Sequence, residues 1–149
     1  MLEKDFAPYE PSLALKELGF DEPCFANYTV IPEDGIDWFT IPEQGITDKT
    51  SFGSSKNYNS KFFEEEGTIS APTFSQAFRW FREKYNIDSW IQPFTSEKSN
   101  GVLYLPDESY SYFIFKDGVW VDDKVDFSEP EEAELACLIK LIEIVKNKQ

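Results

Sequence analysis

Hydrophobic residues recur at helical spacing in two stretches of this chain. In the first, from about 72 to 85, apolar residues fall at i, i+3, i+4, i+7 and i+11, namely Phe74, Ala77, Phe78, Phe81 and Tyr85. This spacing places all of them on one side of a helix, which we expect to face a core. Ser70 or Thr73 can cap the start of this helix, and Asn86 follows its last apolar position.

The second stretch, from about 129 to 147, has a wider apolar side. One stripe consists of Leu135, Leu138, Ile139, Ile142 and Val145, and three more residues, Cys137, Leu141 and Ile144, widen the arc to about 220°. A single sheet cannot cover so wide an arc. The flank therefore packs against another helix or forms an intermolecular surface. Ser128-Glu129-Pro130-Glu131 has the sequence of a capping box at the start of this helix.

Extended segments bounded by turn residues fill much of the remaining chain. Segments 24–31 and 36–41 are rich in β-branched and aromatic residues, and the turn Pro32-Glu33-Asp34-Gly35 between them predicts a hairpin. The phrase Ile-Pro-Glu-x-Gly-Ile begins at Ile31 and again at Ile41. Two copies offset by ten residues are repeated turn chemistry, because true repeat architectures need longer periods and more copies.

Three further extended segments, 87–95, 100–106 and 110–121, follow the first long helix. Pro93 weakens the first of them, and Lys116-Asp117-Gly118 can close a tight hairpin inside the last. A short helix at 11–20 is expected to end with Gly19 in a left-handed conformation.

Together these elements predict an α+β fold. We expect an antiparallel sheet of about four to six strands packed by helices at about 72–85 and 129–147, with a short N-terminal helix. A length of 149 residues predicts one domain, 1–149. Residues 45–61 carry few apolar side chains and predict a long surface loop, either flexible or in contact with a partner.

Charge restricts the partners. The chain has 28 acidic and 14 basic residues, a net charge of −14, so its surface repels phosphate backbones and anionic lipids. We expect no direct nucleic-acid binding and no membrane association. The N-terminal segment lacks the basic and apolar regions of a signal peptide, and Lys140 and Glu143 interrupt the longest apolar segment. These features predict a cytoplasmic protein.

The composition also argues against most catalytic chemistry. The sequence contains no histidine, the commonest general base and metal ligand. Cys137 lies within the apolar terminal helix, and Cys24 can be more open but has no basic neighbour in sequence. The acidic clusters match no calcium-binding loop, and there is no glycine-rich phosphate loop. We therefore assign no catalytic, cofactor-binding or metal-binding residues and expect no cofactor.

The only two arginines, Arg79 and Arg82, lie beside Trp80 and Lys84 on the first long helix. Basic groups interleaved with aromatic rings can bind phosphates or stack on bases. Both arginines fall opposite the aromatic stripe, so the simpler interpretation is a solvated outer face with ion pairs to nearby carboxylates.

Three blocks, LGFDEPCF at 18–25, ISAPTFSQAFRWFREKYNI at 69–87 and EEAELACLIKLIEIVKNK at 131–148, resemble a family of small uncharacterised proteins. Its members are encoded in phages, prophages and mobile elements of gut bacteria. The resemblance covers about 45 residues and implies a cellular context without an assigned activity. That context is an accessory protein made in the cytoplasm of the bacterial host.

Our leading functional hypothesis is a noncatalytic acidic accessory protein that binds another protein. Possible partner-binding residues are the helix flank Cys137, Leu141 and Ile144, which can support a homodimer, together with Arg79 and Arg82. One alternative is a small enzyme or ligand-binding domain with an aromatic-lined pocket built from Trp38, Trp90, Tyr104, Tyr112 or Trp120. A second alternative is nucleic-acid mimicry, in which ordered carboxylates occupy a DNA-binding site on a host protein.

Overall fold

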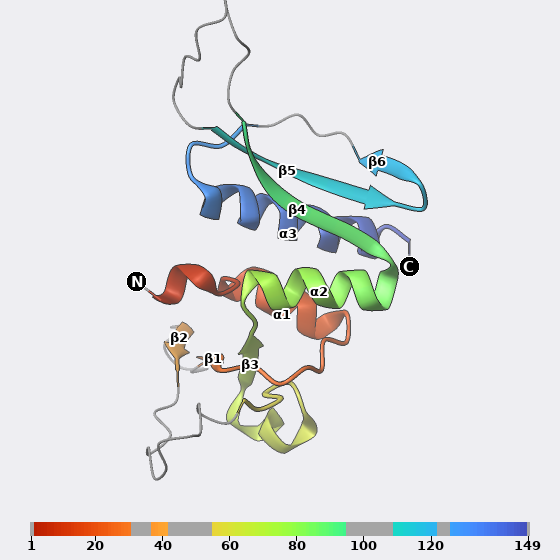
Figure 1. Cartoon of the computed structure of the whole chain (residues 1–149). Helices are drawn as coiled ribbons and strands as arrows, with labels where there is room; N and C mark the ends of the chain where they lie inside the picture. The colour runs from red at the N-terminus through yellow and green to blue at the C-terminus, as the bar shows by residue number, and fades with distance from the viewer. Residues whose placement is uncertain (1, 31–36, 42–54, 95–108, 122–125, 149) are drawn as a thin grey trace, which may run out of the picture. The chain divides into compact units, whose positions relative to one another are not determined.

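The structure is a computed structural model that describes residues 2–30, 37–41, 55–94, 109–121 and 126–148 (Figure 1). By their internal contacts the residues divide into two compact units, Met1–Gln76 (unit 1) and Ala77–Gln149 (unit 2). We describe each unit by itself. The prediction that 1–149 forms one domain stays a prediction.

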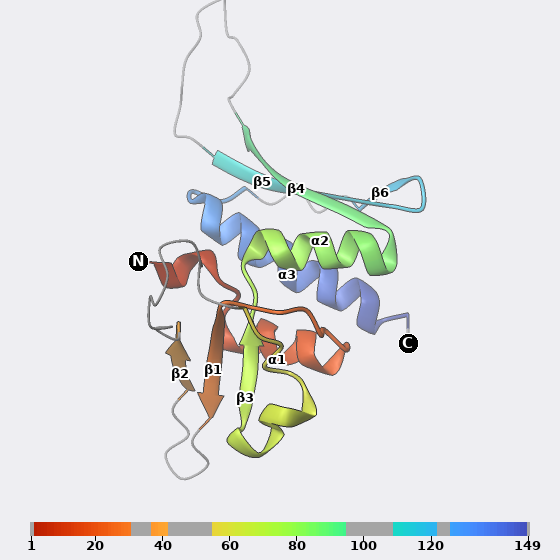
Figure 2. The same cartoon turned by 60° about the horizontal axis from the view of Figure 1, so that its bottom comes forward.

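Unit 1 contains a three-stranded antiparallel sheet in the order β2-β1-β3 (Figure 2). Its elements are η1 (Leu2–Asp5), α1 (Tyr9–Glu17), β1 (Ala26–Val30), β2 (Asp37–Thr40), η2 (Lys61–Glu66) and β3 (Thr68–Ala71). Val30 lies directly opposite Asp37, as the predicted hairpin requires. The turns expected at 32–35 and 42–45 lie outside the described residues.

The short helix α1 ends as its sequence predicts. Gly19 has φ +89°, a left-handed conformation that glycine adopts without steric cost. The Phe20 N–H donates to the Leu15 carbonyl at 2.9 Å, and the Gly19 N–H donates to the Lys16 carbonyl at 3.0 Å. This pair of bonds is the Schellman motif, which satisfies carbonyls that a helix end otherwise leaves without partners.

A buried aromatic cluster of unit 1 lies on one face of its sheet. Cross-strand pairs place small and aromatic side chains together there, and the buried cluster consists of Phe6, Ala26, Tyr28, Ile69 and Ala71. The Tyr28 ring contacts the Tyr9 ring edge-on at 5.7 Å between centroids and the Phe39 ring at 5.4 Å. Helix α1 packs against β3, so α1 and the sheet enclose this aromatic core.

Residues 55–61, the described part of the predicted 45–61 loop, are bound to the rest of unit 1. Lys56 and Cys24 exchange backbone hydrogen bonds of 2.9 and 3.0 Å. The Asn59 side chain donates to the Phe20 carbonyl at 2.9 Å and accepts from the Ser70 N–H at 2.9 Å. The remaining part, 45–54, lies outside the described residues.

Unit 2 contains a second three-stranded antiparallel sheet in the order β4-β5-β6. Its strands are β4 (Ile87–Phe94), β5 (Ser109–Lys116) and β6 (Val119–Val121), and helix α3 (Pro130–Lys146) packs against β5 and β4 (Figure 1). The α+β class is therefore confirmed, although the six strands of the described residues form two sheets instead of one. Pro93 is accommodated because, among the described strands, β4 pairs with β5 alone and so lies at an edge. The segment 100–106 lies outside the described residues.

The hairpin between β5 and β6 closes through the two residues that the sequence indicated. Lys116 lies opposite Val119, and the residues between them, Asp117 and Gly118, have φ values of +50° and +80°. Two consecutive positive φ values are the mark of a type I′ turn, whose twist matches that of the flanking strands.

Helix α2 (Phe74–Tyr85) spans the boundary between the units. Of the two predicted caps, Thr73 acts: its hydroxyl oxygen accepts from the Gln76 N–H at 3.2 Å, whereas Ser70 lies in β3. Asn86 ends the helix with φ +55°. Of the predicted stripe, Phe74, Ala77 and Phe81 are buried, whereas Phe78 and Tyr85 are half-buried. Trp80, outside that stripe, is also buried.

Helix α3 departs from its prediction in two details. The capping box is absent: the Ser128 hydroxyl lies 3.4 Å from a carboxylate oxygen of Glu132, and the helix begins at Pro130 without a side-chain cap. The buried side is also rotated relative to the predicted stripe, because Cys137 and Leu141 are fully buried while Ile139 is exposed. The flank at Cys137 and Leu141 is therefore interior.

Candidate interaction surface on the second sheet

The face of sheet β4-β5-β6 opposite its buried residues carries several aromatic side chains. Trp90 lies opposite Phe113, and Phe115 lies opposite Trp120. Residues directly opposite each other point to the same side of a sheet, and residues two apart on a strand do likewise. Tyr112 and Ile114 point to the other side and are buried. We call Trp90, Phe113, Phe115 and Trp120 the aromatic face.

The four rings contact one another across all three strands. Trp90 stacks on Phe113 with centroids 5.7 Å apart and planes at 17°. Trp120 lies 5.4 Å from Trp90 at 77° and 4.9 Å from Phe115 at 55°. These separations and angles fall among the favourable offset and edge-to-face arrangements. The aromatic face is therefore a preformed cluster whose side chains support one another.

This cluster remains accessible to solvent. Trp120 is 54% exposed and Trp90 is 38% exposed. Exposing large apolar side chains forgoes the free energy that their burial would contribute. Contiguous exposed apolar groups of this kind are typical of interaction sites.

The charge on this face is negative. Asp88 lies opposite Phe115, two positions before Trp90, and is exposed. Among the described residues that the strand register places on this face, Asp88 is the one with a charged side chain. The aromatic face is thus bordered by a carboxylate in a chain of net charge −14.

A polar cluster surrounds Cys24 in unit 1. The Cys24 Sγ lies 3.5 Å from both the Gln76 Oε1 and the Glu22 carbonyl oxygen. The Gln76 Nε2 donates to the Pro23 carbonyl at 2.8 Å and to a Glu22 carboxylate oxygen at 3.3 Å. These bonds join the first turn of α2 to the segment before β1.

Both thiols are protected from reaction. From the sequence, Cys24 could be open to solvent. In the structure its side chain is fully buried, as is that of Cys137. Burial raises the pKa of each thiol to about 12, and the carboxylates of Glu22 and Glu134 add to the shift at Cys24 and Cys137 respectively. A protonated, buried thiol is a poor nucleophile.

The residues considered for partner binding do not gather at one place. Cys137 and Leu141 are buried and Ile144 is partly buried, so the proposed dimer flank is not a free surface. Arg79 and Arg82 are exposed on α2, as a solvated outer face requires.

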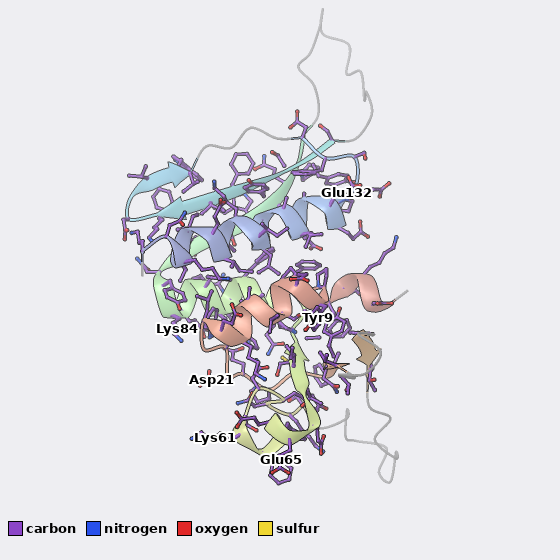
Figure 3. The ribbon with its side chains drawn as sticks, turned by 180° about the vertical axis from the view of Figure 1, so that it is seen from behind. Tyr9, Asp21, Lys61, Glu65, Lys84 and Glu132 are labelled. Carbon is purple, nitrogen blue, oxygen red and sulfur yellow. The ribbon has the colours of Figure 1, made fainter. Side chains whose placement is uncertain are left out.

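The tryptophan between those arginines is not available for stacking on bases. Trp80 is buried, and the Lys84 ammonium lies 4.8 Å from the centroid of its ring. Lys84 is labelled in Figure 3. Lys84 and Trp80 therefore form a cation–π contact within α2.

The residues suggested for an aromatic pocket are separated in the structure. Trp90 and Trp120 meet on the aromatic face, whereas Tyr112 is buried on the opposite side of that sheet. Trp38 belongs to β2 in unit 1, and Tyr104 lies outside the described residues. The sequence analysis did not identify Phe113 and Phe115 as members of this exposed cluster. Their place on one face was predictable, because they alternate with the apolar Tyr112 and Ile114 in a strand that carries aromatic residues on both sides.

Within the described ranges, no group of three or more cysteine, aspartate or glutamate side chains is placed to hold a metal ion. None of the helices in the described part of the chain is long and apolar enough to cross a membrane. The chain matches no protein-family model, no curated protein and no solved structure.

Proposed function

We propose that this chain is a noncatalytic binding protein that engages a protein partner through the aromatic face. The observation that carries this proposal is the exposure of Trp90 and Trp120 in a cluster that is already ordered by contacts with Phe113 and Phe115. Tryptophan residues are enriched among the positions that contribute most to protein–protein binding. Their rigid rings bury a large area at a small cost in conformational entropy.

The noncatalytic part of the proposal is supported by the state of the two cysteines. Both thiols are buried and have a raised pKa, so neither has the thiolate character that a nucleophile needs. The blocks at 18–25, 69–87 and 131–148 support a setting in the cytoplasm of a bacterial host as an accessory protein of a phage or mobile element.

A crosslinking experiment tests the use of this face. A photo-crosslinking residue is placed at Gln92, which is exposed and lies two positions after Trp90 on the same face of β4. In a lysate of the bacterium that produces the chain, we expect a discrete adduct with a protein. Adding Trp120→Ser should reduce the adduct strongly, because it removes the most exposed ring of the aromatic face.

Phe62→Ser is the matched control. Phe62 is 83% exposed but lies on η2 in unit 1, the short helix on which Figure 3 labels Lys61 and Glu65. The change therefore removes an exposed aromatic ring without touching the aromatic face, and we expect the adduct to persist. Equal adduct yields with Trp120→Ser and the unchanged chain, or no adduct at all, would contradict the proposed function.

A further inference from the structure

We infer that the partner segment seated on the aromatic face is an extended, arginine-bearing stretch of polypeptide. This inference rests on the proposed function and adds the chemistry of the partner. It is carried by the charge of the face, the properties of its rings and the spacing between Asp88 and Trp90.

Charge complementarity selects a cationic occupant. Asp88 is the charged side chain that the described strands contribute to this face, and the whole chain has a net charge of −14. An acidic segment would be repelled over the full approach, whereas a basic segment would be attracted.

The rings themselves favour a guanidinium group. The face of an indole attracts a cation placed within about 6 Å of the ring centroid, and tryptophan is the strongest of the aromatic partners. Arginine adds a planar group that stacks on such a ring and is less strongly hydrated than the lysine ammonium. This molecule already contains one contact of the same kind, between Lys84 and Trp80 at 4.8 Å.

The spacing on β4 matches an extended peptide. Asp88 and Trp90 lie two positions apart on the same face of the strand, which corresponds to about 7 Å. The side chains at positions i and i+2 of an extended peptide have the same separation. One arginine can therefore stack on the pair of Trp90 and Trp120. A second arginine, two positions away along the peptide, can pair with the Asp88 carboxylate.

The test uses defined peptides in place of an unidentified partner. The probe is a labelled peptide of the sequence Gly-Arg-Gly-Arg-Gly-Arg-Gly, and binding to the full chain is followed by fluorescence anisotropy. The same peptide with citrulline at each arginine position keeps the shape and removes the charge. A lysine version keeps the charge and removes the planar group.

We expect the arginine peptide to bind, the lysine peptide to bind about 3- to 10-fold more weakly, and the citrulline peptide to bind more weakly still. Raising the salt concentration from about 50 to about 300 mM should weaken the arginine peptide severalfold, since exposed charges are screened. Trp120→Ser and Asp88→Asn should each weaken it, whereas Phe62→Ser should not. Urea unfolding of each variant confirms that it is folded.

Three outcomes would overturn the inference. Equal binding of the arginine and citrulline peptides would show that the charge is not recognised. Unchanged binding in both Trp120→Ser and Asp88→Asn would place the peptide elsewhere on this acidic chain. A concentration-dependent dimer of the unchanged chain that Trp120→Ser dissociates, measured by light scattering, would show that the occupant is a second copy.

The two proposals fail separately. If no peptide binds but the crosslinked adduct at Gln92 still depends on Trp120, the aromatic face binds a protein that is not arginine-bearing. In that case the proposed function stands and this inference falls. If neither the adduct nor peptide binding depends on Trp120, both fall.

Discussion

The indole of Trp120 lies edge-on to the indole of Trp90, with ring centroids 5.4 Å apart and planes at 77°. These residues belong to strands that are not neighbours, because β5 lies between β4 and β6. The two side chains therefore converge over Phe113, whose ring stacks on Trp90 and stands edge-on to Trp120. A solvent-exposed contact that spans three strands is the feature on which the proposed function depends.

Removal of one exposed ring should leave the fold intact. Trp120→Ala loses ring contacts that are worth about 0.5–1.5 kcal/mol, so we expect the free energy of unfolding to fall by about 1 kcal/mol. The comparison is Trp80→Ala, whose ring is buried and whose loss should cost about 3–5 kcal/mol. Urea denaturation followed by circular dichroism measures both. A larger loss for Trp120→Ala than for Trp80→Ala would show that the aromatic face is structural.

The two predicted helix caps should differ in their contribution to stability. Thr73→Ala removes the hydroxyl that accepts from the Gln76 N–H, and we expect a loss of about 1 kcal/mol. Ser128→Ala removes a hydroxyl that makes no cap hydrogen bond to the backbone of α3, so the unfolding free energy should change by less than about 0.5 kcal/mol. Equal losses in the two variants would show that the capping box forms in solution.

The turn of the β5–β6 hairpin should tolerate change at one position only. Gly118→Ala introduces a side chain at φ +80°, although its Cβ would meet open space. The cost is therefore conformational, about 1–2 kcal/mol. Asp117→Gly should be neutral or slightly stabilising, because glycine adopts φ +50° more readily than aspartate. Thermal unfolding of both variants checks this prediction, and an unaffected Gly118→Ala would argue against the type I′ turn.

Alkaline pH should destabilise the protein through its thiols. The pKa of Cys24 and of Cys137 is raised from 9.0 to about 12 in the folded chain. The unfolded chain therefore releases thiol protons first as the pH rises, and stability present below pH 9 is lost progressively between about 9 and 12. At about pH 10 we expect a loss of about 1 kcal/mol for each thiol.

The control for that experiment is a variant with both cysteines changed to alanine. Tyrosine and lysine groups titrate in the same range in both proteins, so the difference between their stability curves isolates the thiols. Urea unfolding at about pH 8 and about pH 10 supplies the four values needed. An equal loss of unfolding free energy between about pH 8 and about pH 10 in the two proteins would mean that Cys24 and Cys137 are accessible to solvent.

Local sequence determined where most elements begin and end. The Gly19 and Asn86 helix ends, the Thr73 cap and the Asp117-Gly118 turn were all readable, because each depends on the conformational preferences of a few adjacent residues. The spacing of apolar residues determined which segments are helices or strands for the same reason.

Tertiary packing decided which of those apolar residues the solvent reaches. Ile139 is exposed while Cys137 and Leu141 are buried on the same helix, and Trp90 is exposed while Trp80 is buried. Helical or strand periodicity places residues on a face, but the identity of the buried face depends on segments that are distant in sequence. The aromatic face exists because β4, β5 and β6 pair in one register, and that pairing is a long-range property that no local pattern contains.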